Sequence, residues 1–212
     1  MAAFTFYYNP MSRAQIARWA LHEVAADYDP VLVEYGPDKP AGFLQANPMG
    51  KIPTLVHHHG GHDHVVTECA AICHYLALTH PQAGLLPGEH EQADYFRWLF
   101  FAAGPVEQAV TCNAMGWVPT EQQQATVGFG SFDRTMDTLD RWLGTHDYVC
   151  GGRFTMADVY LRSSVDWGLT FGSIPARDSF AAYAERLRAR PAYKAAKEID
   201  MGLIAQMQAA AS

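Results

Sequence analysis

A proline at the start of a predicted strand is the first feature with chemical meaning. Pro53 follows Lys51 and Ile52 and precedes a short apolar run. Proline has no backbone N–H, and a cis bond between Ile52 and Pro53 would expose the neighbouring main chain. Residue 52 then offers its amide and carbonyl groups to an extended peptide ligand, in the manner of an added strand. The alternative is an ordinary trans proline that opens an edge strand.

A run of possible metal ligands comes next along the chain. It consists of His57, His58, His59, His62, Asp63 and His64. Imidazole and carboxylate groups bind transition metals, so the cluster suggests a metal site. Alternation along two strands places only some of these side chains on one face. No second ligand set stands out in the sequence, so we expect an adventitious surface site and no functional metal.

These residues lie in a part of the chain where short apolar runs alternate with helical patterns. Such alternation predicts strand–helix–strand units around a sheet with parallel strands. We expect strands at 4–8 and 30–34, a third ending at 56, and a fourth at 65–66 that pairs antiparallel with the third across Gly60-Gly61. Helices are expected at 12–24, near 43, and from 67 to 78.

From residue 80 the pattern changes. Residues 80–88 are rich in proline and glycine, which predicts a linker between a first domain at 1–79 and a second at 89–212. Beyond the linker we expect only helices, near 95–103, 132–143, 156–167 and 180–187, with a tail that frays after Leu203. Thr155 and Asp158 have the spacing of a capping box, whose role is structural.

Composition excludes several classes of function. The chain has 15 Lys+Arg against 22 Asp+Glu, a formal charge of −7, which disfavours binding to nucleic acid or to an anionic membrane. With 49% hydrophobic residues it can bury a sizeable core. We find no signal peptide or transmembrane run, and the four cysteines form no Cys-x-x-Cys pair. We therefore expect a cytoplasmic protein.

Four motifs occur in the order and at the spacing seen in soluble glutathione transferases. They are YYNPMSR at 7–13, NPMGKIP at 47–53, TECAAICHYL at 67–76 and GRFTMAD at 152–158. The chain resembles that family along nearly its whole length. The resemblance implies a thioredoxin-like N-terminal domain with a mixed four-stranded sheet, an all-α C-terminal domain, and a homodimer. It also implies a glutathione site on the first domain beside an apolar pocket made with the second.

Such a site must ionise the thiol of glutathione, because the thiolate is the nucleophile and a free thiol titrates at about 8.5. A hydroxyl bonded to the sulfur and a helix N-terminus aimed at it both favour the anion. The resemblance ranks Ser12, at the start of the first helix, before Tyr7, at the end of the first strand. Tyr8 should point to the opposite face and ranks third. A purely structural N-cap is the alternative for Ser12.

The resemblance also implies how the ends of the tripeptide are held. Glu68 and Cys69 occupy the place where the family usually has an acid followed by serine, at a helix start that receives the γ-glutamyl group. Cysteine is a weaker donor than serine, which weakens that end of the site. Lys51 is expected to reach the glycyl carboxylate, with Lys39 the weaker candidate. The backbone of Ile52 is a further binding candidate, since it depends only on the turn and not on a particular side chain.

The apolar substrate should meet aromatic side chains of the second part. Phe101, Met115 and Trp117 are the candidates, and Met115-Gly116-Trp117, at the break of a long helix, is the best of them. Aromatic residues at helical spacing are more often core, which is the alternative for each.

Three functions remain open at this level. The first is a glutathione transferase that joins the glutathione thiolate to an apolar electrophile, with glutathione as co-substrate. The second is a glutathione-dependent disulfide or peroxide reductase, although that chemistry usually needs a cysteine at the end of the first strand. The third is a non-enzymatic ligand-binding protein on the same fold.

Overall fold

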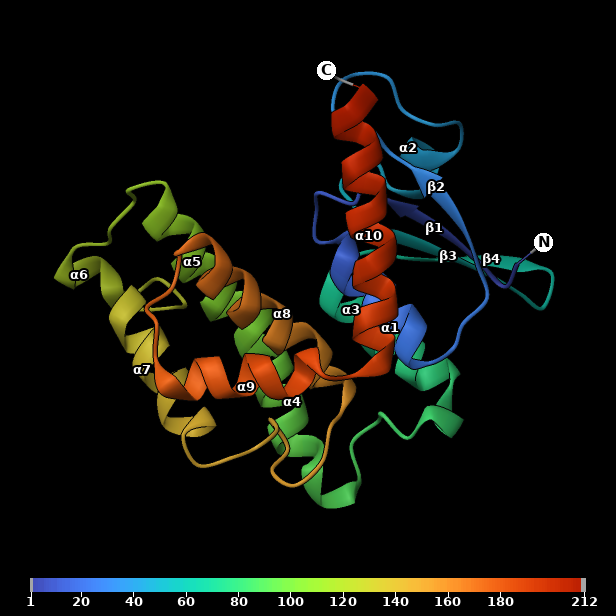
Figure 1. Cartoon of the computed structure of the whole chain (residues 1–212). Helices are drawn as coiled ribbons and strands as arrows, with labels where there is room; N and C mark the ends of the chain where they lie inside the picture. The colour runs from blue at the N-terminus through green and yellow to red at the C-terminus, as the bar shows by residue number, and fades with distance from the viewer. Residues whose placement is uncertain (1, 211–212) are drawn as a thin grey trace. The chain divides into compact units, whose positions relative to one another are not determined.

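The structure is a computed structural model that describes residues 2–210. Its contacts separate into two compact units (Figure 1). The first comprises the residues up to Gly84 and those from Ala189 onward, and the second comprises Leu85–Arg188.

The first unit is built on a mixed four-stranded sheet, as predicted. Its strands are β1 (Phe4–Tyr8), β2 (Tyr28–Leu32), β3 (Thr54–His59) and β4 (His62–Val66), in the order β2-β1-β3-β4. β1 pairs parallel with β2 and antiparallel with β3, which in turn pairs antiparallel with β4. The helices of this unit are α1 (Ala14–Glu23), α2 (Phe43–Ala46), α3 (Cys69–Thr79) and α10 (Pro191–Ala210), with a short 3₁₀ turn at Pro81–Ala83.

Both faces of β1 are buried, which explains its nearly continuous apolar sequence. On one face Tyr7 packs with Val33, Phe43 and Val56 in a small core. On the other face the rings of Phe6 and Tyr8 stack at 5.5 Å. The central strand β1 is therefore covered on both sides.

Helix α10 is the main departure from the predicted organisation. Sequence periodicity predicts no helix here, and the expected fraying after Leu203 is wrong because the helix continues to Ala210. The predicted domain 89–212 includes these residues, yet their contacts group them with the first unit. The physical reason is a buried ion pair: Arg18 Nε lies 2.8 Å from Asp200 Oδ1, and both side chains are 2% exposed. A buried guanidinium on α1 requires such a partner.

The second unit is helical, as predicted. Its helices are α4 (Gln92–Phe101), α5 (Glu107–Ala114), α6 (Glu121–Gln124), α7 (Phe132–Leu143), α8 (Met156–Phe171) and α9 (Asp178–Arg188), preceded by a 3₁₀ turn at Glu89–Glu91. A π-helical segment at Ala102–Val106 joins α4 to α5 and accommodates Pro105, which cannot donate to the helical ladder.

The predicted capping box opens α8, and its acidic residue is completely buried. Asp158 Oδ2 accepts from the amide and the hydroxyl group of Thr155, at 2.8 and 3.1 Å. Its Oδ1 accepts from the Val149 amide and the Tyr183 hydroxyl group, both at 2.8 Å. Burial raises the pKa of Asp158 to about 6, against the opposing effect of these hydrogen bonds. The carboxylate thus joins the start of α8 to a loop and to α9.

Candidate active site

The sheet register brings three chain segments to one edge. Tyr7, near the end of β1, pairs with Thr54 at the start of β3. Leu55 pairs with Val66 at the end of β4. The loop after β1, the turn before β3 and the segment between β4 and α3 therefore meet at this edge. These segments carry the residues that the sequence singles out.

The turn before β3 has the predicted geometry. The peptide bond between Ile52 and Pro53 is cis. Pro53 is buried, and Ile52 is half-buried against the small core around Tyr7. Within residues 2–210, neither the amide nor the carbonyl group of Ile52 has a hydrogen-bond partner. Both groups can therefore pair with an added peptide.

Asn47 shapes this turn from within. Its side-chain amide donates to the Lys51 carbonyl at 2.8 Å and to Thr54 Oγ1 at 3.0 Å. The Thr54 hydroxyl group donates to the same carbonyl at 3.0 Å. Asn47 is 5% exposed, so it has a structural role, and it holds the main chain of residues 51–54 in one conformation.

Ser12 lies just before α1 and is half-buried. Its Oγ accepts from the Ala14 amide at 3.1 Å, which satisfies one free donor of the first turn. Its hydroxyl group donates to the Asn9 carbonyl at 2.7 Å. This contact is of the capping kind, and the role of Ser12 toward a sulfur stays a prediction. A sulfur could receive this proton only if the hydroxyl group turned away from Asn9.

Asn9 is a site-forming residue that sequence reasoning missed. It is fully buried, its side-chain amide donates to the Val33 carbonyl at 3.0 Å, and its Oδ1 accepts from the Met11 amide at 2.9 Å. The available signal was an asparagine directly before a proline, a pair that favours such a turn. Asn9 holds the loop that carries Ser12.

The two tyrosines of β1 point to opposite faces, as predicted. Tyr7 is 8% exposed, and its ring centroid lies 5.3 Å from that of Phe43. Within the described chain its hydroxyl group has no hydrogen-bond partner. Tyr8 instead lies under the guanidinium group of Arg18, which is 4.4 Å from the ring centroid. Tyr8 is therefore a packing residue, whereas Tyr7 keeps a free hydroxyl group.

The start of α3 meets the start of α1. Cys69, the first residue of α3, is buried, and its thiol donates to the Arg13 carbonyl at 3.6 Å. This contact brings two helix N-termini together, and each carries about half a positive charge. One turn further on, the Cys69 thiol and burial raise the pKa of the Cys73 thiol. The pair of N-termini favours an anion at this edge of the sheet.

Glu68 is held in an unusual conformation directly before α3. Its φ is +63°, in the left-handed region that non-glycine residues rarely adopt, and its side chain is exposed. Backbone strain of this kind often accompanies binding sites. Sequence reasoning selected Glu68 but gave no sign of this geometry.

For the site that the family resemblance implies, we predict that Glu68→Ala weakens glutathione binding about tenfold, because the variant loses the expected charge-assisted bond to the ammonium group. Isothermal titration of both proteins measures the change in Kd. Glu34→Ala, on an exposed loop of the same unit, is the matched control and should bind normally. An unaltered Kd in Glu68→Ala would mean that the site is misplaced.

The two candidate lysines differ in their surroundings. The ammonium group of Lys39 donates to the Glu34 carbonyl at 2.7 Å. Lys51 is exposed, and its ammonium group makes no hydrogen bond or ion pair within residues 2–210. Lys51 is therefore the lysine that is available to a carboxylate at this turn.

The predicted apolar-pocket residues all lie in the second unit. Phe101 ends α4 and contacts Trp98, with ring centroids 5.1 Å apart. Met115 and Trp117, which follow α5, are 61% and 65% exposed. Their role in binding a substrate stays a prediction.

The histidines of the β3–β4 hairpin pack against one another and against neighbouring side chains. His57 stacks on Phe4, with centroids 4.4 Å apart, and shares a hydrogen bond of 2.9 Å between its Nδ1 and Tyr75 Oη. His58 pairs with Asp63 on the opposite face, 2.7 Å from Nδ1 to Oδ1. In the part of the chain that the structure describes, no three His, Cys, Asp or Glu side chains are arranged to hold a metal ion.

We predict an acid-linked loss of stability at this hairpin. Burial, followed by the neighbouring histidines, lowers the pKa of His57. Its neutral form stabilises the fold above the unfolded pKa of about 6.5, and that contribution is lost as pH falls through the folded value. His57→Gln should therefore reduce the fall in urea midpoint between pH 7 and pH 5. His90→Gln, an exposed histidine of the second unit, is the control, and an equal reduction there would contradict the assignment.

None of the helices described is both long and apolar enough to cross a membrane.

Comparison with known proteins agrees with this geometry. The family model for the glutathione S-transferase N-terminal domain matches residues 2–78, and that for the C-terminal domain matches 92–191. Glutathione S-transferase 1 of Schizosaccharomyces pombe (strain 972 / ATCC 24843) is 27% identical over 93% of this chain and 96% of its own.

Two solved structures share the fold. A glutathione transferase from Methylococcus capsulatus str. Bath has a TM-score of 0.76 and 28% identity, and the match covers 94% of this chain and 99% of that one. A sphingomonad glutathione S-transferase complexed with glutathione has a TM-score of 0.74 and 27% identity, and the match covers 92% of this chain and 98% of that one. The chain belongs to the glutathione S-transferase family.

Proposed function

We propose that this protein is a glutathione transferase that conjugates the glutathione thiolate to an apolar electrophilic substrate. One observation carries the proposal. At a single edge of the sheet, the unpaired backbone groups of Ile52 lie with the N-termini of α1 and α3, which the contact between Cys69 and Arg13 joins. An anionic peptide with a thiol fits this combination of strand-like pairing and positive potential.

Each end of the tripeptide has a proposed partner. The γ-glutamyl group lies at the start of α3, where the free amides take its carboxylate and Glu68 takes its ammonium group. The cysteinyl backbone pairs with Ile52 beside Pro53, and Lys51 takes the glycyl carboxylate, with Lys39 the weaker candidate. Cys69 replaces the usual serine and donates only weakly.

The chemical step needs little beyond an ionised sulfur. The thiol proton leaves to solvent, the Ser12 hydroxyl group turns from Asn9 to donate to the thiolate, and the N-terminus of α1 stabilises the anion. The thiolate then attacks an electrophilic carbon and forms a C–S bond as the leaving group departs. Tyr7 is the second candidate for the hydroxyl donor. We place the apolar substrate at Phe101, Met115 and Trp117.

The proposal includes a homodimer and a cytoplasmic location, both expected from the family resemblance. It includes no metal, since glutathione alone supplies the nucleophile.

Two measurements test the proposal on the wild-type protein. Isothermal titration should show one glutathione per chain, and an assay with a generic aryl halide should show conjugation. Absence of glutathione binding would contradict the proposal. Binding without conjugation would leave a ligand-binding protein. Disulfide reduction without conjugation would favour the reductase alternative, which usually needs a cysteine at the end of the first strand.

A further inference from the structure

Helix α10 runs antiparallel along α1 through four side-chain pairs. Arg190 of α10 meets Glu23 of α1, with Nε 2.6 Å from Oε1. One turn along, the rings of Tyr193 and Trp19 meet edge to face at 5.1 Å. The buried pair of Asp200 and Arg18 lies further toward the C-terminus of α10. The fourth pair, Lys197 with Gln15, lies at the N-terminal turn of α1.

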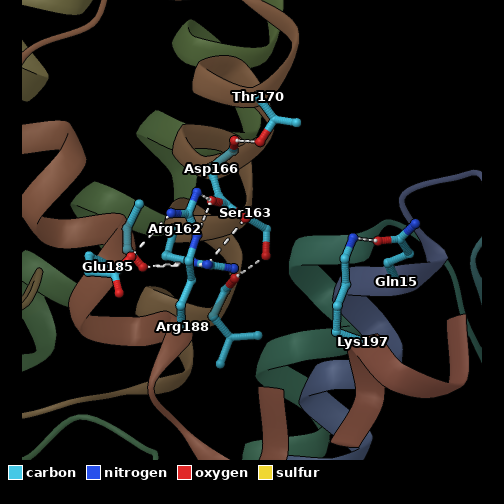
Figure 2. A network of polar contacts seen from close by, with 10 residues as sticks. Gln15, Arg162, Ser163, Asp166, Thr170, Glu185, Arg188 and Lys197 are labelled. Carbon is cyan, nitrogen blue, oxygen red and sulfur yellow. Dashed lines mark hydrogen bonds and ion pairs between the residues drawn. The ribbon is translucent and has the colours of Figure 1, made fainter. Parts of the chain in front are cut away.

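This fourth pair continues into the loop that carries Ser12. The ammonium group of Lys197 donates to Gln15 Oε1 at 3.0 Å (Figure 2). The nitrogen of the same side-chain amide, Gln15 Nε2, donates to the Pro10 carbonyl. The preceding carbonyl, that of Asn9, is the one that holds the Ser12 hydroxyl group. Two adjacent carbonyls of the loop are therefore bound, one by Ser12 and one by Gln15.

The chemistry of the three groups allows only one arrangement. An ammonium group can only donate and a proline carbonyl can only accept, so the Gln15 amide must present its oxygen to Lys197 and its nitrogen to Pro10. A positive charge on the oxygen also strengthens donation from the nitrogen. Lys197 thus fixes both the orientation and the strength of the bond that holds Pro10.

We propose that Lys197 and Gln15 are positioning residues that hold the Pro10–Ser12 segment in place for the thiolate. The inference rests on the proposed function and extends it to a helix at the far end of the chain. The pair is not needed to dock α10, since the buried Arg18 and Asp200 pair, the Trp19 contact and the Glu23 pair remain without it. Lys197 and Gln15 are both half-buried. Burial raises the pKa of Asp200 and the charge of Lys197 acts to lower it, so the Gln15 variants, which keep that charge, isolate the bond to the loop.

The test compares four variants in the conjugation assay. Lys197→Met removes the donor to Gln15, and Gln15→Met removes both bonds. Gln15→Glu keeps an acceptor for Lys197 but cannot donate to Pro10. Lys194→Met is the matched control, an exposed lysine one turn earlier on α10. We expect the first three to lower kcat about tenfold, with the KM for glutathione changed less than about twofold, and the control to match wild type.

Rescue and stability separate positioning from folding. Lys197→Arg keeps the cation and should restore kcat to within about twofold of wild type. Unfolding temperatures of the folded variants should stay close to wild type. If Gln15→Met fails to fold, Lys197→Met tests the same bonds from α10.

The possible failures are distinct. A wild-type protein without conjugation activity overturns the proposed function and this inference with it. An active wild type with unchanged kcat in Gln15→Glu and Lys197→Met overturns the positioning role alone. A loss in Lys194→Met equal to that in Lys197→Met would also overturn it, because the effect would then be one of general charge.

Discussion

Replacing Ser12 with alanine should lower kcat for conjugation about 100-fold while the Kd for glutathione changes little. The hydroxyl group is the proposed donor to the thiolate, and removal of one donor to a developing or stabilised anion has effects of this size. In the proposed site, glutathione binding depends on Ile52, Glu68 and the helix N-termini, and the substitution alters only one bond at the first turn of α1. Steady-state kinetics with an aryl halide and isothermal titration with glutathione measure the two quantities.

The capping role of Ser12 requires a control. Loss of its bond to the Ala14 amide costs about 1 kcal/mol of stability, which a urea titration detects separately. Ser12→Thr keeps the hydroxyl group and should retain most of the activity. An unchanged kcat in Ser12→Ala would transfer the assignment to Tyr7, and Tyr7→Phe would then show the loss instead.

The second large effect concerns the fold rather than the chemistry. Asp158→Asn should lower the free energy of unfolding by about 3 kcal/mol. Each carboxylate oxygen accepts two hydrogen bonds, one of them from a backbone amide. The NH2 group of asparagine must replace one oxygen, so it would face a buried backbone N–H that loses its acceptor, and the hydroxyl group beside it would have to turn and accept instead. Ser131→Ala, at the N-cap of α7, is the matched control and should cost about 1 kcal/mol.

The pH dependence gives this prediction a second readout. Burial raises the pKa of Asp158 to about 6, above that of an unfolded aspartate at about 3.9, so the native state binds the proton more tightly. The proton-linked part of this group's contribution to stability is complete below about pH 4 and is lost as pH rises through 6, whereas the four hydrogen bonds that the carboxylate accepts remain at pH 7. Asp158→Asn should remove that dependence. A variant as stable as wild type at pH 7 would contradict the account of the capping box.

The sheet and most helices could be predicted from sequence because their signals are local. Alternating and helical periodicities identify β1 and α1, and Gly60-Gly61 identifies the β3–β4 hairpin. Candidate residues in short motifs were found for the same reason. The register then brings Tyr7 and Thr54, which follows Pro53, together at one edge of the sheet.

Features that depend on distant partners could not be predicted. Arg18 and Asp200 are 182 residues apart, and their buried pairing is one of several long-range contacts that hold α10 on the first unit. In the sequence Gln15 looks like any helix residue, and only the structure shows that it bonds both Lys197 and the Pro10 carbonyl. The φ of +63° at Glu68 is likewise set by the junction of β4 and α3, and a glutamate in the sequence carries no sign of it.

A crystal structure of the protein soaked with glutathione tests the central claim most directly. The account predicts a tripeptide whose cysteinyl backbone pairs with Ile52 and whose sulfur lies within hydrogen-bond distance of Ser12 Oγ. A sulfur bound to Tyr7 Oη, or an edge of the sheet that takes no glutathione while the ligand binds elsewhere, would contradict it.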